Sequence, residues 1–238
     1  MTFNTLVYQS DFSKDGQPNE TEFIHQIGAH RWGNRELQYY TDKLDNCFVK
    51  DGKLHIIAKK ETIRDTQYTS ARLTTHGKHS WTYGKFEITA KLPKGKGSWP
   101  AIWMLPDQIK MYGWPKGGEI DIMEHVGKDQ DMIHFSLHSE TFNHIKNTHK
   151  TKFRKFDRVS DTFHKYGMIW DEKHIAFYVD DIEYASFQKE NQDTFNEWPF
   201  DQPFHLILNI AVGGNWGGQV DESMLPFEMI ISKIQVFQ

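Results

Sequence analysis

Three acidic residues, Glu119, Asp121 and Glu124, lie within six positions of the segment GEIDIMEHVG. Apolar residues separate them, and this alternation predicts a half-buried β-strand. Side chains two positions apart share one face of a strand, so Glu119 and Asp121 point the same way, whereas Glu124 is one residue out of phase. A β-bulge near Ile122 and Met123 would return Glu124 to the face of the other two, because one inserted residue reverses the phase of all that follow it.

Three carboxyl groups on one strand face can carry out glycoside hydrolysis with retention of anomeric configuration. One carboxylate would act as the nucleophile and one carboxylic acid as the proton donor, with the carboxyl groups about 5–5.5 Å apart. The acid between them would hydrogen-bond to the nucleophile and help set its protonation state. The alternatives are a solvent-facing strand edge with scattered acids and a Ca²⁺ or Mg²⁺ site, although one strand supplies few ligands and the sequence has no DxDxDG loop.

The rest of the sequence predicts the elements that would position this strand. Short alternating runs recur between turn signals, with about a dozen strands spaced ~8–12 residues apart, a pattern typical of a sandwich or jelly roll. The clearest predictions are a hairpin over 47–60, strands over 83–93 and 131–139, a three-strand meander over 164–187, a strand buried on both faces over 204–214, and a closing strand over 228–238. The length of 238 residues suits a single all-β domain spanning residues 1–238.

Composition excludes several classes of partner. The chain has 28 Lys and Arg against 32 Asp and Glu, so no basic excess indicates binding to nucleic acid or to an anionic membrane surface. The basic stretch 146–155 is mixed with Thr, Asn, His and Phe, and we interpret it as a solvated loop. No stretch is long and apolar enough to span a membrane. We expect a monomer that requires no cofactor.

Cys47 is the only cysteine, which excludes an intrachain disulfide and a cysteine-based zinc site. The first residues show no basic region followed by a long apolar run, so they do not predict a signal peptide. As written, the chain fits the cytoplasm, and a secreted protein is expected instead if the chain is a trimmed mature form.

The acidic segment resembles the E-x-D-x-x-E signature of glycoside hydrolase family 16, in its laminarinase (endo-β-1,3-glucanase) branch. The resemblance continues in order through WGNRELQYYT (32–41), DGKLHIIA (51–58), YTSARL (68–73), YGKFEITAKLP (83–93), WPAIWMLP (99–106) and LNIAVGGNWGG (208–218). It implies a jelly-roll β-sandwich with a substrate cleft across its concave sheet. It also implies that Glu119 is the nucleophile, Asp121 its assisting acid and Glu124 the general acid/base. The family's lichenases are similar but lack the extra residue, as E-x-D-x-E.

Three tryptophans are candidate sugar platforms, because aromatic rings stack on the C–H faces of sugars. Trp99, Ala101 and Trp103 share one strand face, and the alternative is that both indoles belong to the core. For Trp103 the resemblance implies a place near the cleaved sugar. Trp114 precedes the acidic strand on a loop, where a core role is less expected.

Four polar residues complete the predicted binding set. Arg72 lies between apolar neighbours and needs a partner, for which a carboxylate of the acidic strand or substrate hydroxyls would serve. The resemblance places Asn34 and Glu36 on the donor side of the cleft, although Asn34 beside a glycine also suits a structural turn. His138 follows His134 and Ser136 on one face of the next strand and is similar to a family histidine close to the acid/base.

A structural calcium site is implied by the resemblance but is incomplete in this sequence. Asp11 and the backbone carbonyl of Gly52 match two of the family's ligands, while Ser232 stands where an aspartate is expected. Serine is a neutral and poor calcium ligand, so we expect a weak site or none.

The resemblance implies an endo-acting retaining β-1,3-glucanase. The first alternative is another family 16 enzyme, acting on mixed-linkage glucan, agarose or a carrageenan. The second is a β-glucan-binding module without activity, which the presence of both Glu119 and Glu124 disfavours.

Overall fold

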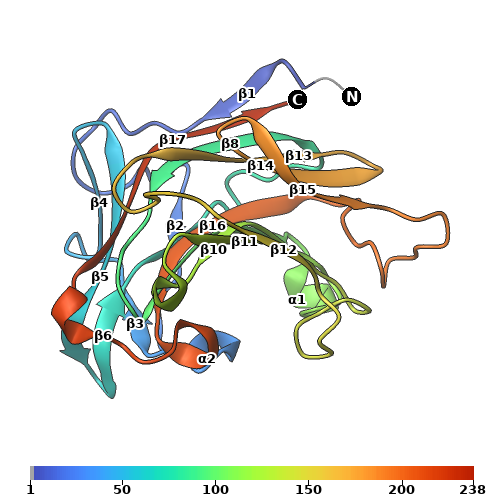
Figure 1. The fold of residues 1–238 in the computed structure, drawn as a ribbon. Coiled ribbons are helices and arrows are strands. Elements are labelled where there is room, and N and C mark those ends of the chain that lie inside the picture. The colour runs from blue at the N-terminus through green and yellow to red at the C-terminus, as the bar shows by residue number, and fades with distance from the viewer. Residues whose placement is uncertain (1–2) are drawn as a thin grey trace.

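The computed structural model describes residues 3–238 and consists of two stacked antiparallel β-sheets (Figure 1). The seven-stranded sheet has the order β12 (Lys150–Lys155), β11 (Met132–His138), β10 (Glu119–His125), β9 (Ser98–Pro106), β16 (Phe204–Val212), β7 (Arg72–Thr74) and β2 (Ile24–His25). The main path of the other sheet is β15 (Ile182–Gln188), β14 (His174–Val179), β13 (His164–Trp170), β8 (Gly84–Lys91), β17 (Phe227–Phe237), β5 (Lys53–Ile63), β6 (Thr66–Ser70) and β3 (Gln38–Tyr40). To it are added β1 (Leu6–Gln9) on β17 and β4 (Cys47–Lys50) on β5, and only the β3–β6 pair among these residues is parallel. The jelly-roll sandwich expected from the sequence is therefore confirmed.

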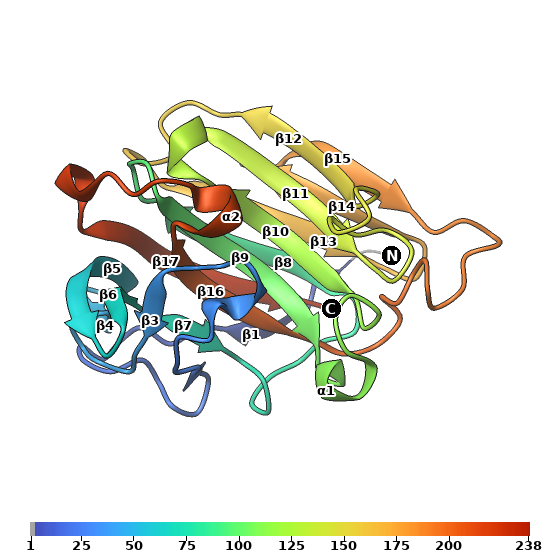
Figure 2. The same ribbon diagram turned by 90° about the horizontal axis from the view of Figure 1, so that it is seen from below.

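Helices are short. They are α1 (Ile109–Tyr112), α2 (Gly214–Gly217) and the 3₁₀ turns η1 (Arg31–Gly33), η2 (Gly127–Asp129) and η3 (Glu222–Met224). Both α1 and α2 lie on the side of the seven-stranded sheet away from the other sheet (Figure 1), near opposite ends of its strands (Figure 2). We call this outward side of the seven-stranded sheet the site face. Across residues 3–238, no helix has the length and apolar character needed to cross a membrane.

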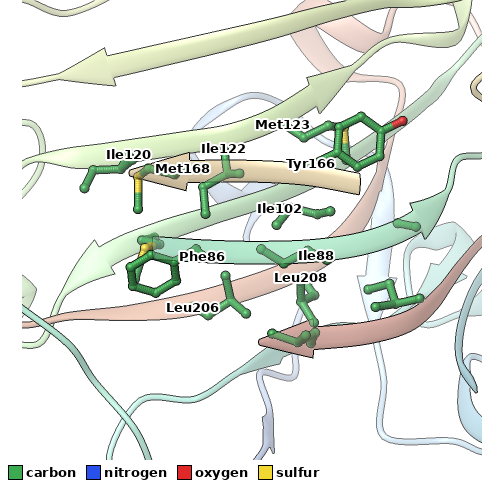
Figure 3. Packing of buried hydrophobic residues seen from close by; sticks show 14 of the residues in the cluster. Phe86, Ile88, Ile102, Ile120, Ile122, Met123, Tyr166, Met168, Leu206 and Leu208 are labelled. Atoms are coloured by element: carbon green, nitrogen blue, oxygen red, sulfur yellow. The ribbon is translucent and has the colours of Figure 1, made fainter. Parts of the chain in front are cut away.

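The core fills the space between the sheets. Ile102, Ile120 and Ile122 of the seven-stranded sheet meet Phe86 and Ile88 of the facing sheet (Figure 3), and all five are fully buried. Burying one such side chain stabilises the fold by about 1.5–3 kcal/mol. The alternation of side chains along a strand determines which of them are buried. In β8 every second side chain is buried. In β16 both faces are covered, as its continuous apolar run predicts.

The predicted strands agree with the structure except along one basic segment. The Asp51-Gly52 hairpin joins β4 and β5, and the meander forms β13, β14 and β15. The prediction of a loop over 146–155 is wrong for residues 150–155, which form the edge strand β12 paired with β11. An edge strand keeps much of its surface in water, so its sequence lacks the apolar alternation that reveals interior strands.

Candidate active site

The predicted bulge is present in β10. On one side, Asp121 pairs with Ser136 and Glu124 with His134, so Ile122 and Met123 together oppose a single residue of β11. On the other side the register against β9 shifts at the same place. Ile122 and Met123 are both fully buried in the core. Glu119, Asp121 and Glu124 are consequently left together on the site face, as the phase of the sequence predicted.

Each glutamate of this group receives an indole N–H. Trp114 Nε1 donates to Glu119 Oε2 at 3.0 Å, and Trp99 Nε1 donates to Glu124 Oε1 at 3.1 Å. Asp121 is 2% exposed and lies between them. The two indoles hold the carboxylates in fixed directions, which suits groups that must meet a substrate at defined angles.

His138 links the nucleophile candidate to the central acid. Its Nε2 lies 3.2 Å from Asp121 Oδ2 and 3.6 Å from Glu119 Oε1, and the ring is buried. The resemblance implied a histidine close to the acid/base Glu124, and the contacts of His138 are instead with Asp121 and Glu119. The three donor atoms of Glu119, Asp121 and His138 lie within 4.8 Å of one another.

Burial is the main influence on the acidity of the three carboxyl groups. It raises the pKa of Glu119 and of Glu124 to about 8, with the negative charge of Asp121 adding to both shifts. Burial likewise raises the pKa of Asp121. Buried carboxyl groups in a cluster ionise one after another. The first carboxylate forms where nearby cations or N–H donors stabilise its negative charge. Each glutamate has one indole N–H, but His138 Nε2 lies next to Asp121 and Glu119, which favours the first charge on that pair, and the charge then helps Glu124 to keep its proton.

Within the chain, Arg72 contacts an amide and two aromatic rings. Its Nε donates to Gln26 Oε1 at 2.6 Å, and its guanidinium lies 4.5 Å from the Trp32 ring centre and 4.6 Å from that of Trp103. Among residues 3–238 no ion pair joins Arg72 to the acidic strand, although the charge of Glu119 acts on it. Substrate hydroxyls, the other partner suggested by the sequence, stay a prediction. Arg72 is 8% exposed, and its guanidinium orients the Trp103 ring on the site face.

Trp103 and Glu36 belong to one hydrogen-bonded chain. Trp103 Nε1 donates to Asn209 Oδ1 at 2.7 Å, Asn209 Nδ2 donates to the Tyr40 hydroxyl at 3.0 Å, and that hydroxyl donates to Glu36 Oε2 at 3.3 Å. Gln38 also donates to Glu36. Trp103 is half-buried and faces outward rather than into the core between the sheets.

The remaining predicted residues lie around this centre. Trp99 is nearly buried, but it packs edge to face with Trp216 at 5.4 Å and touches Glu124, so it belongs to the site face and not to the main core. Trp114 lies beside His138 and His144, with ring centres 5.9 and 4.9 Å away.

Asn34 has the structural role considered for it, while its place on the donor side of the cleft stays a prediction. Its main-chain oxygen accepts from Asn215 at 2.8 Å, which ties the loop after η1 to α2. This is the structural role, and it leaves the side chain beside Glu36.

Several residues near the centre were missed by sequence reasoning. Trp32 lies in a loop with left-handed backbone and carries no periodic signal. His144 and His149 lie 5.4 Å from His138 between ring centres, and the loop that brings them there is not periodic either. Asn209 did carry a signal, because it is the single amide within an apolar strand.

The expected calcium ligands lie apart from this site. Asp11 is exposed, and hydrogen bonds from the Ser13 side chain and from the Ser13 backbone, the latter at 3.0 Å, lower its pKa. Ser232 falls at a register shift of β17, and its hydroxyl donates to the Thr89 carbonyl at 3.4 Å. A serine held in this way offers no charge to a calcium ion.

A two-sheet β-sandwich that gathers two glutamates and an aspartate on one face defines a class, the glycoside hydrolases that work with paired carboxyl groups. The sequence profile of glycosyl hydrolases family 16 matches residues 32–226. The chain therefore belongs to glycoside hydrolase family 16.

Relatives support this assignment over nearly the whole chain. The chain is 45% identical over 243 residues to a beta-glucanase of Rhodothermus marinus, covering 98% of this chain and 85% of the relative. It is 42% identical over 225 residues to a glucan endo-1,3-beta-glucosidase of Cryptopygus antarcticus, covering 90% and 82% respectively. The solved structure of the laminarinase from Rhodothermus marinus has a TM-score of 0.95 at 44% identity, covering 98% of this chain and 97% of that one.

Proposed function

We propose that the chain hydrolyses β-1,3-glucan of the laminarin type, cutting within the polysaccharide and retaining anomeric configuration. The observation that carries the proposal is the bulge in β10, which places Glu119 and Glu124 on one face with Asp121 between them. Relatives named for β-glucan hydrolysis support the substrate class.

The mechanism follows from the environment of each carboxyl group. The Glu119 carboxylate attacks the anomeric carbon while protonated Glu124 gives its proton to the departing glycosidic oxygen, and a glycosyl ester of Glu119 forms. Glu124, now ionised, removes a proton from water, which attacks the ester and releases Glu119. Asp121 and His138 act as positioning residues for the Glu119 carboxylate.

A neutral substrate fits the distribution of charge. The basic edge strand β12 lies in the same sheet as the acidic group, but Lys150 lies over Phe142 and Trp198, and Arg154 lies over Tyr184. These two cations are thus engaged by aromatic rings, and Lys155, in phase with Phe153, is the cation that β12 leaves toward the site face. Sulfate groups would require several cationic partners, so we disfavour carrageenan-type substrates.

Proton NMR during early laminarin digestion tests the proposal. Two successive inversions restore the original configuration, so the new reducing ends should appear first as the β-anomer and mutarotate afterwards. An initial α-anomer would overturn the mechanism. Parallel digestion of lichenan and agarose with product analysis tests specificity, and release of sugars from agarose but not from laminarin would overturn the proposed substrate.

Deleting Met123 should leave a folded protein with strongly reduced activity. The deletion removes the extra residue, so Glu124 either faces the core or requires β10 to take a new register against β9. Laminarin hydrolysis and thermal unfolding measure the two effects. The matched control is Met123→Leu, which conserves volume and the bulge, and should lose less than about 1.5 kcal/mol of stability. Equal activity of the deletion and the control would show that the bulge has no part in catalysis.

Calcium should change the melting temperature only slightly. Ligand binding stabilises a fold according to affinity, and Ser232 supplies no charge at the expected site. Unfolding in the presence of excess Ca²⁺ and of the calcium-selective chelator EGTA measures the difference. Ser232→Asp provides the comparison, because restoring the carboxylate should increase the calcium-dependent shift. A large shift in the unaltered protein would contradict the prediction.

A further inference from the structure

A second group of metal-ligating side chains lies outside the catalytic group. His76, Asp107 and His205 each offer a donor atom, and these atoms lie within 4.8 Å of one another. His205 Nδ1 is 3.0 Å from Asp107 Oδ1, and the His76 and His205 rings meet edge to face with centres 4.6 Å apart. The Asp107 main-chain oxygen, 3.4 Å from His76 Nε2, adds a fourth possible donor. Two imidazoles and a carboxylate thus converge at one point.

The three residues come from neighbouring strand ends. His205 is the second residue of β16 and alternates with core residues Phe204 and Leu206, so it points to the site face. His76 closely follows β7, and Asp107 directly follows β9. Both of these strands pair with β16. The ligands are therefore carried by adjacent strands of one sheet.

Backbone hydrogen bonds hold this corner of the sheet in place. Thr75 N donates to the Leu206 carbonyl at 3.0 Å, and Leu206 N donates to the Thr75 hydroxyl at 3.0 Å. Asp107 N donates to the Pro203 carbonyl at 3.0 Å. Each ligand is thus held by backbone hydrogen bonds, at an adjacent residue for His76 and His205 and at the residue itself for Asp107, without help from an ion. A group held by its supporting shell binds a metal with less loss of conformational freedom.

The donor set indicates the class of ion. Imidazole nitrogen with one carboxylate suits zinc, nickel, copper and cobalt, whereas calcium and magnesium prefer oxygen ligands throughout. His205 is 2% exposed, while Asp107 and His76 are partly exposed, so an ion could enter from solvent. Water would fill the positions that the protein leaves open.

We propose that His76, Asp107 and His205 form a binding site for a divalent first-row transition metal such as Zn²⁺ or Co²⁺. The site ties together the ends of β7, β9 and β16. It is separate from Glu119, Asp121 and His138, and it does not depend on the proposed glucanase activity.

Calorimetric titration of the chelator-treated protein with Zn²⁺ and Co²⁺ tests the proposal. The expected result is one ion per chain, with visible Co²⁺ absorption bands and a higher melting temperature. His76→Gln and Asp107→Asn should each weaken binding at least about tenfold. Both are partly exposed, and thermal unfolding without metal shows whether each variant folds.

Two controls locate the ion. His174→Gln removes another histidine paired with an aspartate, Asp171, and this pair has no third ligand among residues 3–238, so the variant should bind metal as the unaltered protein does. Glu119→Gln removes a donor from the catalytic group and should also leave the affinity unchanged. The proposal is overturned if the unaltered protein binds neither ion, if His76→Gln and Asp107→Asn bind with unchanged affinity, or if only Glu119→Gln weakens binding. The first outcome would leave His205 and Asp107 as a hydrogen-bonded pair with a purely structural role.

Discussion

Replacing Glu119 with glutamine should abolish turnover of every substrate, with a loss of kcat on the order of 10⁴-fold or more. An amide cannot form the glycosyl ester on which both chemical steps depend. The size of the side chain is unchanged, and the Trp114 N–H still finds an oxygen acceptor. The measurement is kcat on laminarin and on an aryl β-glycoside, which should fall together because the nucleophile serves both.

Glu87→Gln is the matched control for this experiment. The Glu87 side chain is 13% exposed and that of Glu119 is 16% exposed, so the two carboxylates are similarly covered. Glu87 lies in β8 of the facing sheet and pairs with Lys85 and Lys165. The Glu87→Gln variant should be somewhat less stable than the unaltered protein and should keep its kcat. Retention of substantial activity by Glu119→Gln would remove this residue from the nucleophile role.

Glu124→Ala should lose activity on laminarin by about 10²–10⁴-fold, the range that general acid catalysis contributes. The first step on an aryl glycoside with a good leaving group should be affected far less, because such a group departs with little protonation. A burst of released phenol followed by slow turnover is expected, since the second step still lacks its general base. Azide should accelerate that second step, because this nucleophile needs no deprotonation. Equal losses on both substrates would contradict the assignment.

The same residue predicts the alkaline limit of activity. A general acid works only while protonated, and burial raises the pKa of Glu124 to about 8. Activity on laminarin should therefore fall as pH rises through this region. In Glu124→Ala the alkaline fall should disappear from the first step on the aryl glycoside. A pH profile of the burst rate measures it, and an unchanged alkaline limit would assign that limit to another group.

The arrangement of the acidic group in β10 was predictable because its signal is local. In a regular strand Glu124 would face away from Asp121, and a β-bulge is one of the few features that can bring both to one face. The bulge lies at Ile122 and Met123, the two apolar residues between them. The interior strands were predictable for the same reason, since alternation records which face is buried. β12 was not predictable in this way, because a basic edge strand buries few side chains and its sequence therefore shows no apolar alternation.

Residues that act through distant partners were harder to predict. Arg72 was recognised as needing a partner, but its partners, Gln26 and the rings of Trp32 and Trp103, are separated from it by as many as 46 positions in the chain. His76 and His205 carry no ligand spacing in the sequence, and only the pairing of β7 and β16 brings them near Asp107. Contacts of this kind depend on sheet order, which a single sequence specifies weakly.

The bulge also has a consequence for enzyme engineering. Ile122 and Met123 anchor the bulge through side chains that are fully buried between the sheets. Glu119 and Glu124 lie before and after the bulge in the chain, and their side chains are on the site face. A library confined to these two positions and to Phe135, the residue opposite them, would alter the separation of the carboxyl groups without touching any group that meets the sugar. Because the bond-forming steps depend on that separation, such hidden positions offer a way to adjust the balance between hydrolysis and transfer to another sugar.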